Sequence, residues 1–351
     1  MKAAYHKYTL KFKQPAGTSR GVLRTKKTYF LIIKQENKIG IGEANLFKGL
    51  SSDDKPDYEK KMQWLVHNIQ LPKSDILEYL KDYSSLIFGW EQALKSLENK
   101  KPYLLYPSDF TNGTKNIPIN GLIWMGSKKF MFEQIKNKIA SGFKVIKLKI
   151  GAINFGDELD LLKYIRQQFT ADEIEIRVDA NGAFAPDTAL EKLKRLSDFD
   201  LHSIEQPIRA GQIEKMTQLC QKTPIPIALD EELIGYNYHF DKQSFLAMIK
   251  PHYIILKPAL HGGFSGTKSW IKAAENNHTG WWITSALESN IGLNAIAQFT
   301  YQLKVQMPQG LGTGGLFTNN FDSPLFIKQG HLNFDPNRSF NYKNLIASTD
   351  I

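Results

Sequence analysis

The chain of 351 residues has a single cysteine, Cys220, so it forms no disulfide within itself. No cysteine or histidine stands at the spacing of zinc ligands. The sequence also lacks a run of about 18 apolar residues, the length that a membrane-spanning helix needs. Residues 1–7 lack the apolar core of a signal peptide. These absences predict a cytoplasmic protein in a reducing compartment, with no membrane partner.

Acidic residues are fewer than basic residues: the chain has 35 Asp and Glu residues and 45 Lys and Arg residues, which give a net charge of +10. The basic residues are spread along the chain in doublets such as Lys26-Lys27 and Lys128-Lys129. Dispersed doublets are typical of a solvated surface, whereas a nucleic-acid footprint is a basic stripe on one face. We therefore predict a small-molecule partner and no nucleic acid, and polyanion binding is the weaker alternative.

The first part of the chain contains strand patterns followed by helical patterns. Strand-like stretches occupy residues 5–12, 28–34 and 39–44, and amphipathic helical stretches occupy residues 58–70 and 84–97. Strands first and helices afterwards are typical of an α+β unit. The sequence therefore predicts an α+β domain over residues 1–110.

Farther along the chain, short apolar strands alternate with amphipathic helices, which is typical of βαβ units. About eight strands are expected, at residues 117–121, 145–150, 174–179, 201–205, 225–230, 253–257, 281–285 and 306–311. Asp157 and Asp187 are expected to be helix N-caps. We predict a modified (β/α) barrel of the TIM type over residues 111–317. The tail at residues 318–351 loses the repeat and is expected to pack back onto the first domain.

Alternation of side chains along these strands separates residues that face the helices from residues that face the barrel interior. In the second strand, Ile146, Leu148 and Ile150 suit the helix side, so Lys147 and Lys149 point inward. The same alternation directs inward four charged residues near the carboxyl ends of later strands: Asp179, Glu205, Asp230 and Lys257. Active sites of this barrel type lie at that end. Inward charges are costly unless paired or metal-bound, so the pattern predicts a site.

The inward carboxylates form an all-oxygen site that suits Mg²⁺, for which Mn²⁺ can substitute: Asp179, Glu205 and Asp230. A metal-bound carboxylate is more acidic at its α-carbon, and a lysine on either side of the site could remove that proton. The ordinary pKa of lysine is about 10.4, so the pKa of the base must be lowered. Lys147, next to Lys149, and the metal cation both act in that direction.

The motifs around these residues resemble, in order and spacing, signatures of the enolase superfamily branch that contains muconate-lactonizing enzymes. The motifs are Lys147-Leu148-Lys149, Asp179-Ala180-Asn181, Glu205-Gln206-Pro207, Leu229-Asp230-Glu231 and Leu256-Lys257-Pro258. The resemblance covers nearly the whole chain and implies that the first domain caps the barrel. It also implies Lys149 as the base, Lys257 opposite it, and the carboxylates of Asp179, Glu205 and Asp230 as metal ligands. Glu231 could replace Asp230, but alternation places it on the outer face or in the loop.

Further segments resemble superfamily members that remove water from a cyclohexadiene hydroxy acid with a succinyl side chain. They imply substrate contacts at Arg20, Asn181, Ser285, Glu288, Gly314 and Gly315. Arg20 belongs to a loop expected to close over the substrate, and the last four residues follow the seventh and eighth strands. The resemblance therefore implies a carbon–oxygen lyase with a small carboxylate as substrate.

Two alternatives remain open. An N-acylamino-acid racemase, a dipeptide epimerase or a cycloisomerase would share the fold and metal site, because specificity lies in the loops. A non-catalytic barrel that binds acidic ligands is the weaker alternative, since the carboxylates and both lysines are intact. Metal titration with an assay of α-proton exchange separates an enzyme from a binding protein.

Overall fold

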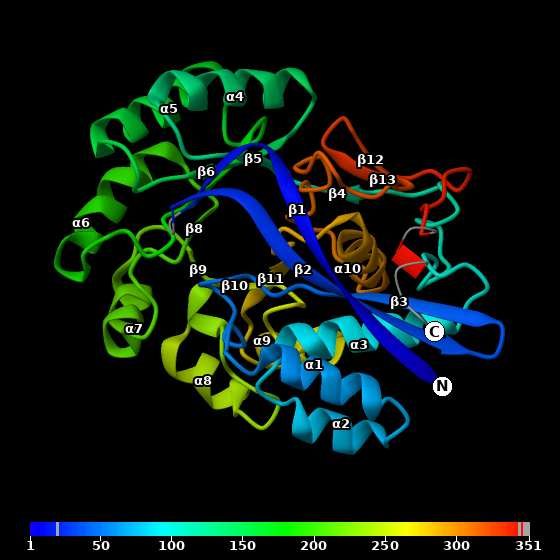
Figure 1. Ribbon diagram of the computed structural model, residues 1–351. Helices are drawn as coiled ribbons and strands as arrows, with labels where there is room; N and C mark the ends of the chain where they lie inside the picture. Colours follow the sequence, from blue (N-terminus) through cyan, green and yellow to red (C-terminus); the bar gives the residue numbers. More distant parts are fainter. Residues whose placement is uncertain (19–20, 343–344, 347–351) are drawn as a thin grey trace.

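The computed structural model describes residues 1–18, 21–342 and 345–346, and Figure 1 shows their arrangement. A long two-stranded ribbon and a group of helices lie over one end of a curved parallel sheet (Figure 1). Arg20, a predicted substrate contact, lies outside the described residues. Among the helices of the described ranges, none is both long and apolar enough to cross a membrane.

The first sheet is antiparallel and pairs its strands in chain order: β1 (Lys2–Thr18), β2 (Gly21–Gln35) and β3 (Lys38–Ala44). β1 and β2 are longer than predicted because they continue as a ribbon beyond the sheet (Figure 1). One face is covered by α1 (Tyr58–His67), α2 (Lys73–Tyr79) and α3 (Ser84–Leu97). α3 lies directly on β3, since a Cβ at Gly42 would meet the carbonyl oxygen of Gly89 at 1.8 Å. Glycine at both positions therefore permits this close approach.

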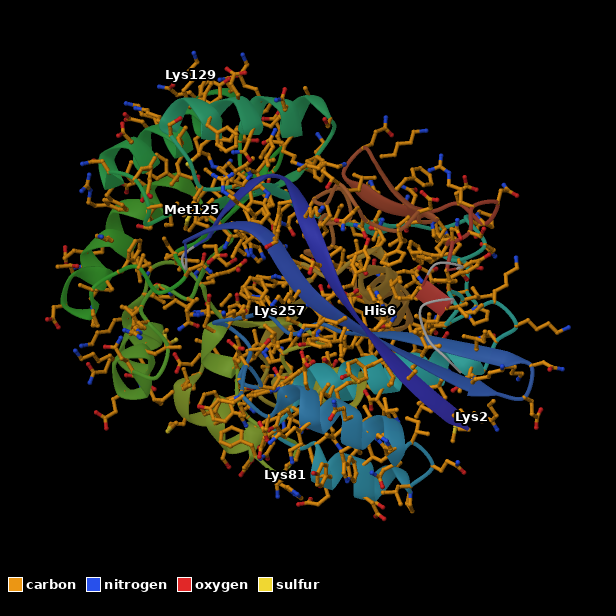
Figure 2. All side chains as sticks on the ribbon, in the orientation of Figure 1. Lys2, His6, Lys81, Met125, Lys129 and Lys257 are labelled. Atoms are coloured by element: carbon orange, nitrogen blue, oxygen red, sulfur yellow. The ribbon has the colours of Figure 1, made fainter. Side chains whose placement is uncertain are left out.

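In the described chain, the parallel sheet has seven strands in sequence order. They are β5 (Gly121–Ile123), β6 (Val145–Lys149), β7 (Glu175–Asp179), β8 (Ser203–Glu205), β9 (Ile227–Leu229), β10 (Tyr253–Leu256) and β11 (Gly280–Ile283). The helices between and after them are α4 (Lys128–Ala140), α5 (Phe155–Gln168), α6 (Pro186–Leu196), α7 (Ile213–Lys222), α8 (Lys242–Ile249), α9 (Gly263–Asn276) and α10 (Asn290–Gln302). Figure 2 labels Lys257, which follows β10, near the middle of the molecule.

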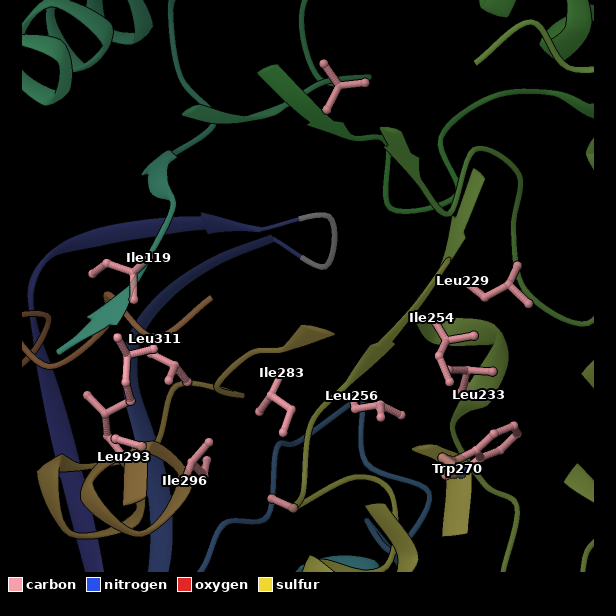
Figure 3. Packing of buried hydrophobic residues seen from close by; sticks show 14 of the residues in the cluster. Ile119, Leu229, Leu233, Ile254, Leu256, Trp270, Ile283, Leu293, Ile296 and Leu311 are labelled. Atoms are coloured by element: carbon pink, nitrogen blue, oxygen red, sulfur yellow. The ribbon is translucent and has the colours of Figure 1, made fainter. Parts of the chain in front are cut away.

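The main core lies between this sheet and its helices. Ile254 and Leu256 of β10 and Ile283 of β11 belong to one buried cluster with Trp270 of α9 and Ile296 of α10 (Figure 3). Ile254 and Leu256 have the parity opposite to that of Lys257, which the sequence directs toward the barrel interior. The alternation therefore orients the strands as the sequence predicts.

The barrel closes differently from the prediction at its first and last strands. The predicted eighth strand at residues 306–311 is reduced to isolated parallel bridges that join Gln309 to Ile119 and Gly310 to Thr284. Pro308 cannot donate a ladder hydrogen bond, and glycine weakens a strand, which explains the short pairing. The first barrel strand also starts later than predicted, at β5. Its predicted beginning is β4 (Ile117–Pro118), which pairs antiparallel with a strand of the tail.

Two predicted helix caps are wrong by a few residues. Asn154 caps α5 by accepting a hydrogen bond from the backbone N–H of Gly156 at 2.8 Å. Ala185 precedes α6, whose first residue is proline. Asp157 and Asp187 lie instead in the first turns of these helices, where a negative charge is favourable next to the helix dipole.

The tail forms β12 (Leu325–Lys328) and β13 (His331–Phe334), and β13 pairs with β4. Just before β12, the side chain of Asn319 accepts a hydrogen bond from the N–H of Lys11 and donates one to the carbonyl of Thr9, both at 2.8 Å. The tail therefore contacts both β1 and the start of the barrel.

Candidate active site

A cavity of about 120 Å³ lies where the parallel strands end. Six charged side chains and the amide of Asn181 come from β6 and from segments at the ends of β7, β9 and β10: Lys147, Lys149, Asp179, Asn181, Asp230, Glu231 and Lys257. We call this set the charged floor. The carboxyl ends of parallel strands meet at one edge, which is why residues far apart in sequence gather here.

Ion pairs hold the lysines of the charged floor against its carboxylates. The ammonium of Lys149 lies 2.9 Å from Asp179 Oδ2 and 2.6 Å from Asn181 Oδ1. Lys147 pairs with Asp179 at 3.1 Å and also with the buried carboxylate of Glu205. Lys257 lies on another strand, with its ammonium 2.6 Å from Asp230 Oδ2. The six inward residues thus face one another, as alternation predicts.

Burial and neighbouring charges shift the pKa values of these groups in different directions. Burial alone would raise the pKa of Asp179, but Lys147 and Lys149 outweigh it and lower that pKa. Burial raises the pKa of Glu205 to about 8, because the attraction of Lys147 is offset by repulsion from other carboxylates. Burial would lower the pKa of Lys147 and of Lys257, but the carboxylates beside them raise both. A lysine base of lowered pKa therefore requires that another cation neutralise these carboxylates.

The carboxylate oxygens of the site fit a hard cation in chemistry. Glu205 Oε1 and Asp230 Oδ1 are buried and accept no hydrogen bond from any described residue. Such oxygens are costly unless they gain a partner, and Mg²⁺ prefers oxygen ligands. Within the described ranges, no three Asp, Glu, His or Cys side chains already form a metal-binding group. In this structure the ammonium of Lys147 pairs with the carboxylates of both Asp179 and Glu205.

Glu231 is a site residue that the alternation misplaced. Its carboxylate lines the cavity and accepts a hydrogen bond from Asn181 Nδ2 at 3.0 Å. β9 ends at Leu229 and a 3₁₀ turn, η2 (Glu231–Leu233), follows Asp230, so the two-residue alternation no longer applies. Burial and the charge of Asp230 raise the pKa of Glu231. Both acidic side chains therefore face the cavity, and alternation gives no reason to prefer one as a ligand.

The backbone of Lys257 is fixed by a buried histidine, His261. His261 Nδ1 accepts a hydrogen bond from the backbone N–H of Lys257 at 2.8 Å. Burial lowers the pKa of His261 to about 3, so the ring is neutral and keeps this acceptor at ordinary pH. His261 therefore anchors the start of the loop after β10.

Two of the predicted substrate contacts line the cavity, namely Asn181 and Ser285. Ser285 Oγ shares a hydrogen bond of 2.6 Å with Thr313 Oγ1, which the sequence analysis did not single out. The hydroxyl pair joins the loops that follow the seventh strand and the bridge at Gly310. It gives this side of the cavity donors for a polar group of a substrate.

Three other predicted substrate contacts lie outside the set of residues that line the cavity. The described residues that line the cavity include Gly312 and Thr313 but not Glu288, Gly314 or Gly315. The Glu288 carboxylate is buried behind the loop, where it accepts a hydrogen bond from Ala286 N–H at 2.6 Å. Loop residues follow no strand period, so their direction could not be read from the sequence.

Opposite the charged floor, the cavity has an apolar wall that the sequence analysis missed. Its main side chains come from segments after β3, β5 and β11: Phe47, Leu50, Trp124 and Leu287. Phe47 and Leu287 are buried in one cluster with Leu10 and Phe317. We call Phe47, Leu50, Trp124 and Leu287 the apolar wall. Large apolar side chains in predicted loops were the available signal, because exposed loops are usually polar.

Comparison with known proteins identifies relatives that cover this whole arrangement. Residues 131–337 match the family model described as enolase C-terminal domain-like. An o-succinylbenzoate synthase of Desulfotalea psychrophila is 45% identical over 363 aligned residues, which cover 95% of this chain and 98% of the relative. The resemblance inferred from the motifs is thereby confirmed.

Solved structures give the same result for the fold. The crystal structure of MenC from Desulfotalea psychrophila matches with a TM-score of 0.85 and 41% identity, covering 95% of this chain and 99% of that one. A dipeptide epimerase of Cytophaga hutchinsonii, solved with Mg and the dipeptide D-Ala-L-Val, matches with a TM-score of 0.81. Its identity is 20%, over 98% of this chain and 97% of that chain, so it supports the fold alone. The predicted enolase-like α/β fold is confirmed.

Proposed function

We propose, on the premise that this chain belongs to the enolase superfamily and within it to the o-succinylbenzoate synthases, that it is a lyase with that activity. It dehydrates a cyclohexadiene hydroxy acid bearing a succinyl side chain to o-succinylbenzoate, on the route to menaquinone. The observation that carries the proposal is the identity of 45% over nearly the full length of a synthase. The enzyme acts in the cytoplasm on a small carboxylate, without a nucleic-acid or membrane partner.

Lys149 is the base in this proposal. Its ammonium nitrogen lies in the cavity and is oriented by Asp179 and Asn181. It removes the proton on the carbon next to the substrate carboxylate and, on the same face, returns it to the departing hydroxide, which leaves as water. A single proton-transfer residue is sufficient for dehydration on one face.

Lys257 has the complementary role of a fixed positive charge. It directly follows β10, and the carboxylate of Asp230 helps to raise its pKa. A group that stays protonated donates hydrogen bonds to the negative charge that develops on the substrate. Lys147 holds Asp179 and Glu205 in place from below.

Asp179, Glu205 and Asp230 are proposed to hold Mg²⁺, or Mn²⁺ in its place. When bound, the ion supplies stabilisation of the negative charge on the substrate carboxylate. Support comes from the buried oxygens of Glu205 and Asp230 that have no hydrogen-bond partner among the described residues, because Mg²⁺ prefers oxygen ligands. The apolar wall faces the ring and excludes water from the charges.

Turnover of the purified protein tests the proposal. With Mg²⁺ present, the succinyl cyclohexadiene acid should be converted to the aromatic product, which is followed by the change in ultraviolet absorbance. Lys149→Ala is the matched control, because it removes the base and leaves the other charged residues in place. Efficient racemisation of N-acylamino acids or dipeptides without dehydration would replace the synthase assignment by one of the superfamily alternatives.

A further inference from the structure

A buried polar network joins the first domain to the loop at residues 285–289, which connects β11 to α10. Lys26 of β2, Glu43 of β3 and Asn45 supply one side of the network, and Glu288 and Ser289 supply the other. All five residues are at least nine-tenths buried. The same loop presents Ser285, Ala286 and Leu287 to the active-site cavity. The network therefore lies directly behind a wall of the cavity.

Asn45 is the central link of this network. Its amide nitrogen donates to the carbonyl oxygen of Ala286 at 3.0 Å and to Glu288 Oε1 at 2.8 Å. Its amide oxygen accepts a hydrogen bond from the Lys26 ammonium. One side chain of the first domain thus holds residues on both sides of Leu287.

Glu43 holds the other end of the loop. Its Oε1 accepts a hydrogen bond from the N–H of Ser289 at 3.0 Å, and its Oε2 accepts from Ser289 Oγ at 2.6 Å and from the N–H of Gly292 at 2.9 Å. These N–H groups belong to the first turn of α10, where a carboxylate is favourable. A carboxylate from β3 therefore caps a barrel helix.

Between these two anchors, Leu287 has a strained backbone. Its φ is 59°, in the left-handed region that a leucine rarely adopts. Such strain costs about 1–3 kcal/mol and persists where surrounding contacts determine the conformation. This conformation packs the side chain with Phe47, Leu10 and Phe317 in the cluster behind the apolar wall.

We propose that Asn45 and Glu43 are positioning residues for the substrate: they hold the strained loop so that Leu287 and Ser285 form one wall of the cavity. Both act through the loop, since neither lines the cavity among the described residues. The inference rests on the proposed dehydration, and it gives the first domain a specific task beyond covering the barrel. It predicts that substrate affinity depends on hydrogen bonds located outside the cavity.

The test compares Asn45→Ala with Asn294→Ala. Asn294 is also a buried asparagine, and it donates to the carbonyl of Tyr103 at 2.8 Å, away from the loop. Asn45→Ala should raise KM by roughly tenfold and change kcat by less than about threefold, which is the pattern of lost substrate binding. Asn294→Ala should lower thermal stability and leave KM unchanged.

A second readout does not depend on turnover. In Asn45→Ala, hydrogen exchange at the amides of Ser289 and Gly292 should become faster by at least about tenfold, because the loop opens locally. In Asn294→Ala these amides should exchange as in the unchanged protein. If the unchanged protein fails to dehydrate the substrate, the proposed function is wrong, and hydrogen exchange still decides whether Asn45 holds the loop.

Asn45→Asp provides the variant of nearly identical shape if the alanine variant does not fold. It keeps an oxygen for Lys26 but loses the donor to Ala286 and places a second carboxylate next to Glu288. It should raise KM and accelerate exchange at the same amides. Folded Asn45 variants with unchanged KM and unchanged exchange overturn the inference. Equal changes of KM in the Asn45 and Asn294 variants overturn it as well, because they indicate general destabilisation.

Discussion

The charged floor and the apolar wall of the cavity are built in different ways. Most charged residues of the floor stand in or just after a parallel strand, so a regular scaffold sets their direction, and Glu231 follows in the 3₁₀ turn η2. The wall is assembled from three connections that are far apart in the sequence, around Phe47, Trp124 and Leu287. A regular scaffold thus fixes the direction of the charged groups, whereas contacts between distant connections fix the direction of the apolar side chains.

The largest effect is expected from the carboxylates of the floor. Asp179→Asn and Glu205→Gln should each lower kcat/KM by about 10³-fold or more, because charge stabilisation of the substrate carboxylate is lost. Chelation should abolish turnover of the unchanged protein, and Mg²⁺ or Mn²⁺ should restore it. Circular dichroism checks that the variants stay folded. Full activity in excess chelator would remove the metal from the proposal.

The two lysines of the floor should differ from each other. Lys149→Ala should abolish both dehydration and exchange of the α-proton with solvent, since it removes the base. Lys257→Ala should lower kcat by about 10²–10³-fold, which is the usual loss for one preorganised donor. Steady-state kinetics and proton exchange in D₂O measure the two effects. Both lysines proving indispensable for exchange would instead indicate a racemase or epimerase, which transfers protons on two faces.

Substitutions in the apolar wall should change KM more than kcat. Leu50→Ala removes a partly buried side chain of the apolar wall and should raise KM by roughly tenfold with little change in kcat. Leu71→Ala is a suitable control because Leu71 is 40% exposed and lies in the same domain. A fall in kcat with constant KM in Leu50→Ala would mean that the wall acts on the reaction step, and the contrast between floor and wall would disappear.

The smallest effect is a dependence of stability on pH that arises behind the wall. Burial and the charge of Glu43 raise the pKa of Glu288 to about 7, from an ordinary value of 4.5. The folded state therefore binds the proton more tightly than the unfolded state, and this contribution to stability is lost as pH rises from 4.5 to 7. Melting curves should show that Glu288→Gln reduces the decline in Tm over that range by a few degrees. Identical slopes for both proteins would show that folding does not raise the pKa of Glu288.

The difference between floor and wall also explains how far the sequence could predict the structure. Strand alternation correctly turned Lys149, Asp179 and Lys257 toward one another, because a parallel strand imposes a period of two residues. The prediction failed for Glu231, where the strand has already become a 3₁₀ turn. Alternation gives no direction for Glu288, which lies in a loop and accepts a hydrogen bond from Asn45, 243 residues away in the chain. Such distant contacts leave no periodic signal in a single sequence.

The pairing of β13 with β4 has a consequence for biosynthesis. A ribosome releases β1 and β4 well before Asn319, which bonds to β1, and before His331–Phe334, which pair with β4. At a translation rate of about 5–20 residues per second, the edges of β1 and β4 lack these partners for tens of seconds. During that interval they can pair with other nascent chains. Chaperones that shield strand edges should therefore increase the yield of this protein, and a chain shortened before residue 331 should aggregate.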